Sequence, residues 1–168
     1  MIVSDASPLI SLSRVGRLEL LRILHGTAAV PPAVHREVVT EGKRRGRPDA
    51  LAVEAAVGKW IEVRPLPPRF ARSAEALRTE GRLGRGEAES IALAVALRAP
   101  LLMDDRAAVA VARRHGVATT WSTSLVLEAV VGGKLLRNEG RRIVEDLVTA
   151  GHHIAPGVLV ELLRELSE

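Results

Sequence analysis

The chain has 168 residues, 47% of them hydrophobic and only 2% aromatic, so it is long enough to bury a core built from Leu, Val, Ile and Ala. It has no cysteine, which excludes a disulfide framework and thiolate metal sites and fits a reducing, cytoplasmic setting. The formal net charge of +4 is compatible with a polyanionic partner without establishing one.

Short apolar runs alternate with helical patterns in the first part of the chain. The N-terminus does not resemble a signal peptide, because it lacks a basic segment and carries Asp5 early. Prolines at 31 and 32 favour a helix start. The expected elements are a strand over 1–4, helical segments over 7–24 with a break near Gly16, a strand over 27–30 and a helix over 31–41.

The same alternation continues to the C-terminus, and no apolar run approaches the roughly 20 residues that cross a bilayer. A helix is expected over 49–58, with Asp49 as its N-cap and Gly58 as its C-terminal stop. A strand over 60–63 ends at a proline-rich stretch. The remaining expected elements are strands over 100–103 and 117–120 and helices over 70–80, 84–99, 106–116 and near 123–132, 138–150 and 157–167.

Five short strands that alternate with helices predict an α/β protein with a parallel sheet. The strands are apolar throughout, as expected when helices cover both faces of a sheet. No internal repeat, linker or second domain is evident, so residues 1–168 are predicted to form a single domain. The C-terminal helices are expected to pack on the sheet or to form a dimer surface.

Acidic residues stand where the predicted strands and helices meet. Ligands of open parallel sheets bind beyond the carboxyl ends of the strands, and right-handed crossovers start each helix near the end of the preceding strand. Asp5 follows the first strand and Asp105 the fourth, while Glu87 lies at the start of one predicted helix and Glu37 one turn into another. This topology predicts that the four carboxylates gather at one edge of the sheet.

Each acid also has a simpler explanation as a helix cap, a partner of a helix dipole or a solvated side chain. Four carboxylates that converge in a crevice repel one another, however, unless a cation lies among them. Hard oxygen ligands without cysteine favour Mg²⁺ or Mn²⁺. Such an ion can activate water and stabilise an in-line displacement at phosphorus.

Basic residues cluster in the stretch EGKRRGRP, residues 41–48, which is expected to be a loop bounded by glycine and proline. It contains Lys43, Arg44, Arg45 and Arg47. A solvated loop and a phosphate-binding loop are both open at this point.

Five stretches together resemble PIN-domain proteins of the VapC-like ribonuclease kind, and more narrowly the small prokaryotic subgroup with "DASPLI" and "GExEAIxLA…DD" motifs. They are VSDASPLI (3–10), VPPAVHREV (30–38), GRGEAESIALAVAL (84–97), LLMDDRAAVAVARRHGV (101–117) and TTWSTSLVLEAVVGGKL (119–135). The match is collinear over residues 1–136, which leaves 137–168 as C-terminal helices. It implies an α/β/α sandwich with a five-stranded parallel sheet.

The resemblance also implies an activity, a site and partners. The activity is metal-dependent endoribonuclease cleavage of RNA, with an antitoxin partner if the protein is a toxin, and homodimers are usual in the family. The catalytic acids fall on Asp5, Glu37, Glu87 and Asp105, and Mg²⁺ or Mn²⁺ would be held by Asp5, Glu87 and Asp105. Ser7 would hold the first acid or a metal-bound water. Residues expected to bind the RNA backbone are Lys43, Arg44, Arg45, Arg47 and Arg85, with Arg82 and Arg106 as further candidates.

Two positions depart from the family pattern. Glu87 replaces the commoner Asp, and Glu89 is a neighbouring competitor for the same role. Met103 replaces a Thr whose hydroxyl helps to orient the site, a role that Asp104 can share as a possible metal ligand. The pair His152 and His153 lacks partners at metal-ligand spacing, so it is not predicted to bind metal.

Two other protein classes do not fit the sequence, and one alternative to the nuclease stays open. A phospho-receiver domain needs an acceptor Asp after the third strand, and a haloacid-dehalogenase-type phosphatase needs a second acid or Thr two places after the first; neither is present. The alternative that stays open is a non-catalytic or weakly active PIN-like module that binds RNA or protein.

Overall fold

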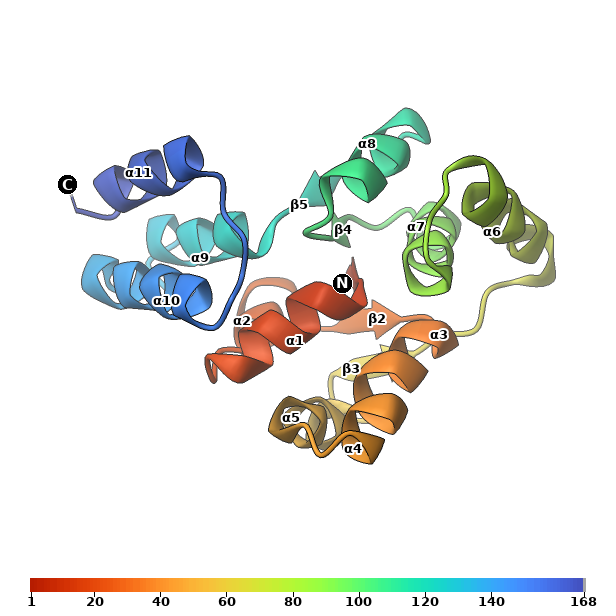
Figure 1. Ribbon diagram of the computed structural model, residues 1–168, viewed down its shortest axis with the longest axis horizontal. Coiled ribbons are helices and arrows are strands. Elements are labelled where there is room, and N and C mark those ends of the chain that lie inside the picture. The colour runs from red at the N-terminus through yellow and green to blue at the C-terminus, as the bar shows by residue number, and fades with distance from the viewer. Residues whose placement is uncertain (168) are drawn as a thin grey trace.

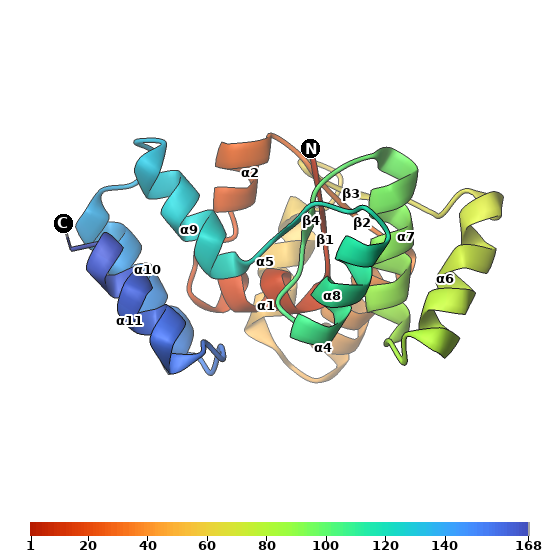
Figure 2. The same cartoon turned by 90° about the horizontal axis from the view of Figure 1, so that it is seen from above.

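The computed structural model describes residues 1–167 as a five-stranded, all-parallel sheet with helices on both faces (Figures 1 and 2). The strands lie in the order β3-β2-β1-β4-β5. Their bounds are β1 Ile2–Ser4, β2 Ala28–Val30, β3 Ile61–Val63, β4 Leu101–Leu102 and β5 Thr119–Thr120. The predicted α/β fold and all five strands are confirmed, and the first and fourth strands are neighbours.

The helices follow the predicted alternation with the strands. Their bounds are α1 Ala6–Arg14, α2 Leu20–His25, α3 Pro32–His35, the π-helix η1 Arg36–Glu41, α4 Gly42–Arg44, α5 Pro48–Ala56, α6 Pro68–Glu80, α7 Arg85–Leu97, α8 Arg106–Arg114, α9 Ser122–Val131, α10 Arg137–Thr149 and α11 Pro156–Glu165. None of the helices described over residues 1–167 is long and apolar enough to cross a membrane.

Successive strand residues supply the two halves of the core, because side chains alternate between the faces of a sheet. Ile2 and Ala28 join a cluster with α1, α2, α5 and α9, whereas Val3 and Ala29 join a cluster with α6, α7 and α8. In both cartoon views α6 and α7 lie at one end of the molecule and α9, α10 and α11 at the other (Figures 1 and 2). Burial on both faces explains why β2 and β4 are apolar throughout, whereas β3 and β5 at the edges carry Glu62, Thr119 and Thr120.

Two local predictions were wrong. Asp49 is not an N-cap: α5 begins at Pro48 with Arg47 as its cap residue, because proline fits the first helical position, and Asp49 is buried beside Arg14, with 3.6 Å between Asp49 Oδ1 and Arg14 Nε. The basic stretch 41–48 is not wholly a loop. The helix that begins at Pro32 continues through the π-helix to Arg44, so the first two basic residues are helical.

Gly42 sets the close packing of α4 on α5. A Cβ at Gly42 would lie 2.8 Å from the Cβ of Ala50, a contact that only a shift of one helix can relieve. We expect Gly42→Ala to lower the free energy of unfolding by about 1–3 kcal/mol, measured by urea denaturation. Gly157→Ala in α11 is the matched control, because nothing lies within 4 Å of its added Cβ. Equal stability of the two variants would contradict this account of the packing.

Candidate active site

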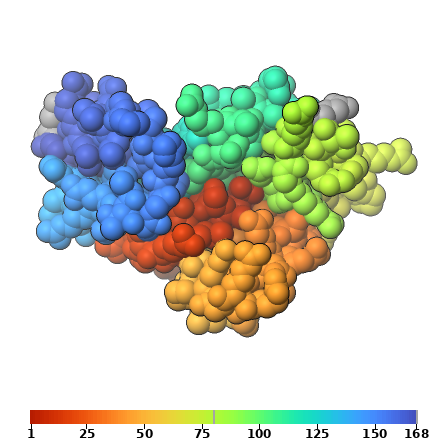
Figure 3. Space-filling model, in the orientation of Figure 1, coloured from red at the N-terminus to blue at the C-terminus, as the bar shows by residue number. Residues whose placement is uncertain are grey.

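The carboxyl ends of β1 and β4 meet at one edge of the sheet. The strands pair with Val3 opposite Leu101, and the N–H of Asp5 donates to the carbonyl of Leu102 (3.0 Å). In the space-filling view three segments surround the N-terminal residues (Figure 3). They are the segment that contains α3 and α4, helix α7 and helix α8. A pocket of about 500 Å³ opens here, lined by five carboxylates: Asp5, Glu37, Glu87, Asp104 and Asp105.

Asp5 is the buried acid of this pocket, with a side chain that directly follows the central strand and is only 5% exposed. Burial raises its pKa from 3.8 to about 7, opposed by the N–H of Ala6, while the charges of Glu87 and Glu37 raise it further. Asp5 stands at the N-cap of α1 but makes no capping hydrogen bond. Near neutral pH it is therefore poised to lose its proton when a cation arrives.

Glu37 shares a small space with Asp5 because residue 86 is glycine. A Cβ at Gly86 would lie 3.3 Å from Oε2 of Glu37 and 3.7 Å from Oδ1 of Asp5. Any side chain at this position would fill the space that both oxygens face. Glu37 is the second residue of the π-helix η1, and π-helical turns occur frequently at functional sites.

Glu87 and Asp105 each use one oxygen to cap a helix. Oε2 of Glu87 accepts from the N–H of Gly84 (2.7 Å), and Oδ1 of Asp105 accepts from the N–H of Ala108 (2.8 Å). The simpler explanation of both acids as caps thus holds in part. The second oxygen of each makes no hydrogen bond with the residues that the structure describes, so capping and cation binding are compatible.

Asp104 differs from its neighbour because both of its oxygens are engaged. Ser122 donates its N–H to Oδ1 (2.9 Å) and its hydroxyl to Oδ2 (2.6 Å), which ties Asp104 to the start of α9. His152 lies beyond, with Nδ1 3.9 Å from Oδ2 of Asp104 and 3.2 Å from the hydroxyl oxygen of Ser11. No sequence pattern predicts this contact, because it depends on how the loop after α10 returns to the sheet.

Of two other residues predicted near the site, one lines the pocket and the other does not. Ser7 is exposed and lines the pocket beside Asp5. Glu89, the competitor of Glu87, does not line it: its Oε2 accepts from the N–H of Ala33 (3.2 Å) and its Oε1 pairs with Arg85 (2.8 Å). Glu89 therefore joins α7 to α3, and Glu87 is the acid of this helix that faces the pocket.

The basic residues divide into two groups. Arg85 lines the acidic pocket, and Arg45 and Arg47 line a recess beside it. Lys43 instead pairs with Glu54 at 2.7 Å, and Arg44 with Glu41 at 2.7 Å.

The donor set suits a hard cation, although the side chains are not arranged around one. Among the side chains described over residues 1–79 and 81–167, no three acidic or histidine groups come close enough to a common point to hold a metal ion. All five donors of the pocket are carboxylates, which are the ligands that Mg²⁺ and Mn²⁺ prefer. The space at Gly86 admits oxygens of Asp5 and Glu37, so the residues fit such an ion once Glu87 and Asp105 turn their free oxygens inward.

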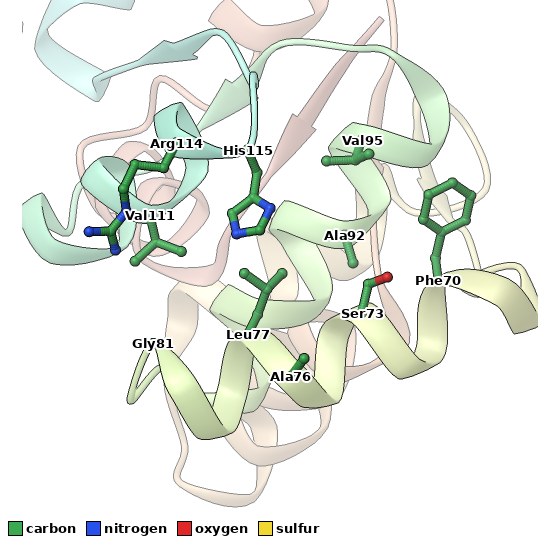
Figure 4. A pocket seen from close by; sticks show the side chains of 10 residues that line it. All are labelled: Phe70, Ser73, Ala76, Leu77, Gly81, Ala92, Val95, Val111, Arg114 and His115. Atoms are coloured by element: carbon green, nitrogen blue, oxygen red, sulfur yellow. The ribbon is translucent and has the colours of Figure 1, made fainter.

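A second pocket of about 460 Å³ lies among α6, α7 and α8, away from the acids (Figure 4). Phe70, Leu77 and Val95 contribute apolar walls, and His115 points into the space beside Arg114 (Figure 4). Among the side chains that the structure describes, its lining contains no carboxylate, so these residues offer no ligand that a hard cation prefers.

An all-parallel sheet with carboxylates gathered at the ends of its strands defines an α/β protein with a candidate hydrolytic site. A family model described as a PIN domain matches residues 1–168, and the chain belongs to the PIN-domain family. PIN domains are usually nucleases and generally use divalent metal ions. A search of curated proteins finds none that matches the chain.

Proposed function

We propose that the protein is a metal-dependent endoribonuclease that hydrolyses RNA phosphodiester bonds, with Asp5, Glu37, Glu87 and Asp105 as its catalytic acids. The observation that carries this proposal is the gathering of these acids around the buried carboxyl of Asp5, whose pKa is raised to about 7. Membership of the PIN-domain family supports a nuclease. The net positive charge is compatible with a polyanionic substrate.

Asp5, Glu87 and Asp105 would hold Mg²⁺ or Mn²⁺, which when bound supplies activation of water and neutralisation of charge on the phosphate. Asp5 is fixed by the central strand, and Glu87 and Asp105 by the starts of α7 and α8. Glu37, whose Oε2 faces the same space at Gly86 as Oδ1 of Asp5, would orient the attacking water. Arg85, at the rim, would neutralise phosphate oxygens.

Asp104 and Ser7 are proposed to support this site. Because Ser122 occupies both oxygens of Asp104, we assign Asp104 to holding α9 against the sheet and not to the metal. The hydroxyl of Ser7 is placed to orient Asp5 or a water in the pocket.

The proposed biological role and partners rest on the resemblance of the DASPLI and DD segments to VapC-like proteins. We propose a single domain over residues 1–168 that acts in the cytoplasm as the toxin of a toxin–antitoxin pair. A cognate antitoxin would cover the acidic pocket, and the protein would form a homodimer. The absence of cysteine fits a cytoplasmic setting.

The test is cleavage of a varied RNA pool by the purified protein with Mg²⁺, with Mn²⁺ and with EDTA. We expect cleavage within RNA strands in either metal and none in EDTA, and Asp5→Asn should abolish it, because this change removes the buried ligand. Cleavage that persists in EDTA, or that Asp5→Asn retains in full, would overturn the proposal.

Two observations favour a second function, a non-catalytic PIN-like module that binds RNA or protein. Among the described residues the acids do not converge on one point, and Met103 stands where the family has an orienting hydroxyl. RNA binding without cleavage by the wild-type protein in millimolar Mn²⁺ would favour this alternative.

A further inference from the structure

A basic recess of about 380 Å³ adjoins the acidic pocket. The two share Glu37, Arg85 and Gly86 as a common wall. Beyond this wall the recess is lined by Ala33, by Glu41 and by three more arginines, Arg36, Arg45 and Arg47. A polymer that extends from the acidic pocket into the recess therefore passes from a lining rich in carboxylates to one rich in guanidinium groups.

The turn after α4 delivers two of these arginines. The N–H of Gly46 donates to the carbonyl of Lys43 (2.9 Å), and the N–H of Arg47 donates to that of Gly42 (2.9 Å). With Gly46 at a φ of +67°, these bonds form a Schellman motif that ends the helix. The motif places Arg45 and Arg47 on either side of Gly46, and both line the recess.

Ion pairing separates the arginines of the recess from the other cations of the same turn. Lys43 and Arg44 are matched by Glu54 and Glu41. Arg36, Arg45 and Arg47 form no ion pair with the side chains that the structure describes, and Arg85 is paired only with Glu89. The lining has four arginines and two carboxylates, Glu37 and Glu41, and Glu41 is already paired with Arg44, so the recess keeps a net positive charge suited to an anion.

We propose that Arg36, Arg45, Arg47 and Arg85 bind the RNA phosphate next to the one that is cleaved. This inference rests on the proposed function. Guanidinium groups bind phosphate oxygens through paired, planar hydrogen bonds, which suits several arginines around one phosphodiester. The shared wall sets the order along the strand: the scissile phosphate lies over the acids and its neighbour lies in the recess. Lys43 and Arg44 are not part of this site.

The test compares two double variants that each remove two positive charges from the same turn, Arg45→Gln with Arg47→Gln and Lys43→Gln with Arg44→Gln. Binding of a fluorescent single-stranded RNA is measured by anisotropy in EDTA, over a range of salt concentrations. We expect the first double variant to bind about tenfold or more weakly. Its slope of log K against log salt should fall by about 0.7 for each lost phosphate contact. The second leaves Glu41 on the recess wall without its partner Arg44, so it should weaken binding only severalfold, clearly less than the first.

Arg36→Gln, an exposed change on the π-helix outside the turn, gives a second route if the turn variant does not fold. It too should weaken binding and reduce the salt slope. A second measurement uses RNA with one uncharged methylphosphonate linkage beside the cleaved bond. The wild-type protein should cleave this modified RNA more slowly than unmodified RNA. The Arg45→Gln, Arg47→Gln variant should cleave the two RNAs at the same rate.

The outcomes separate this inference from the proposed function. Equal weakening by the two double variants would show that only overall charge matters and would overturn the recess. RNA that binds and is cleaved normally by the Arg45→Gln, Arg47→Gln variant would overturn the recess and leave the nuclease intact. Failure of the wild-type protein to bind or cleave any RNA would overturn both.

Discussion

In EDTA at pH 8, replacement of Asp5 with asparagine is expected to stabilise the protein, by up to about 4 kcal/mol. The reason is that burial raises the pKa of Asp5 from 3.8 to about 7, so the folded protein holds this ionised carboxylate at a cost. Asparagine has the same shape without the charge, and its amide can donate to the neighbouring carboxylates. Urea denaturation in metal-free buffer measures the effect.

The pH dependence has a definite sign. Below pH 3.8 Asp5 is protonated in both the folded and the unfolded chain and does not alter their balance. Between pH 3.8 and about 7 the unfolded chain loses this proton while the folded chain keeps it, so stability falls as pH rises. The wild-type protein should lose stability across this window relative to Asp5→Asn, and added Mn²⁺ should narrow the difference.

Asp49→Asn is the matched control, since Asp49 and Asp5 are both 5% exposed. Asp49 lies in the first turn of α5 with Arg14 3.6 Å away, so its charge has a favourable partner and a favourable helix end. Its replacement should lower stability at pH 8. If Asp5→Asn also lowers the free energy of unfolding at this pH, the ionised carboxylate of Asp5 does not destabilise the fold as its raised pKa indicates.

Replacement of Glu87 with glutamine is expected to slow RNA cleavage roughly 100-fold or more, because an amide cannot replace a carboxylate as a ligand of a hard cation or as a neutralising charge. The fold should change little. The amide oxygen of glutamine can still accept the N–H of Gly84, which Glu87 accepts at 2.7 Å. Single-turnover cleavage rates in Mn²⁺ measure the effect.

Glu139→Gln controls for the cap itself. Glu139 accepts the N–H of Leu136 at 2.9 Å in a capping box of the same kind at the start of α10. It does not line the acidic pocket. Its replacement should leave the cleavage rate unchanged. A comparable loss of activity in both variants would assign the role of Glu87 to helix capping alone.

The sheet was predictable because its signal is local and its geometry is general. The run Ala28–Val30 is apolar and buried at every position, as expected for a strand covered on both faces. Right-handed crossovers then bring Asp5, Glu37, Glu87 and Asp105 to one edge without any knowledge of side-chain contacts. The structure places all four in one pocket, and adds Asp104.

The sequence could not predict features that depend on one residue of register or on distant loops. Nothing in the apolar spacing identified the π-helix that carries Glu37, although the adjacent buried pair Val38 and Val39 fits its wider turn. The separation of Glu89 from Glu87 depends on the N–H of Ala33 in another helix. The approach of His152 to Asp104 depends on the return of the chain after α10.

The strand that carries Asp5 is the central one, hydrogen-bonded on both sides, to β2 and to β4. Arg45 and Arg47 belong to an exposed turn after the three-residue helix α4. Segments open locally with free energies that run from near zero in such turns to the global value in central strands. Amide hydrogen exchange at the arginines should thus be fast and at Asp5 slow. If the recess binds RNA as proposed, the turn that carries the arginines could open and release the RNA while the carboxylate on the central β-strand stays in place.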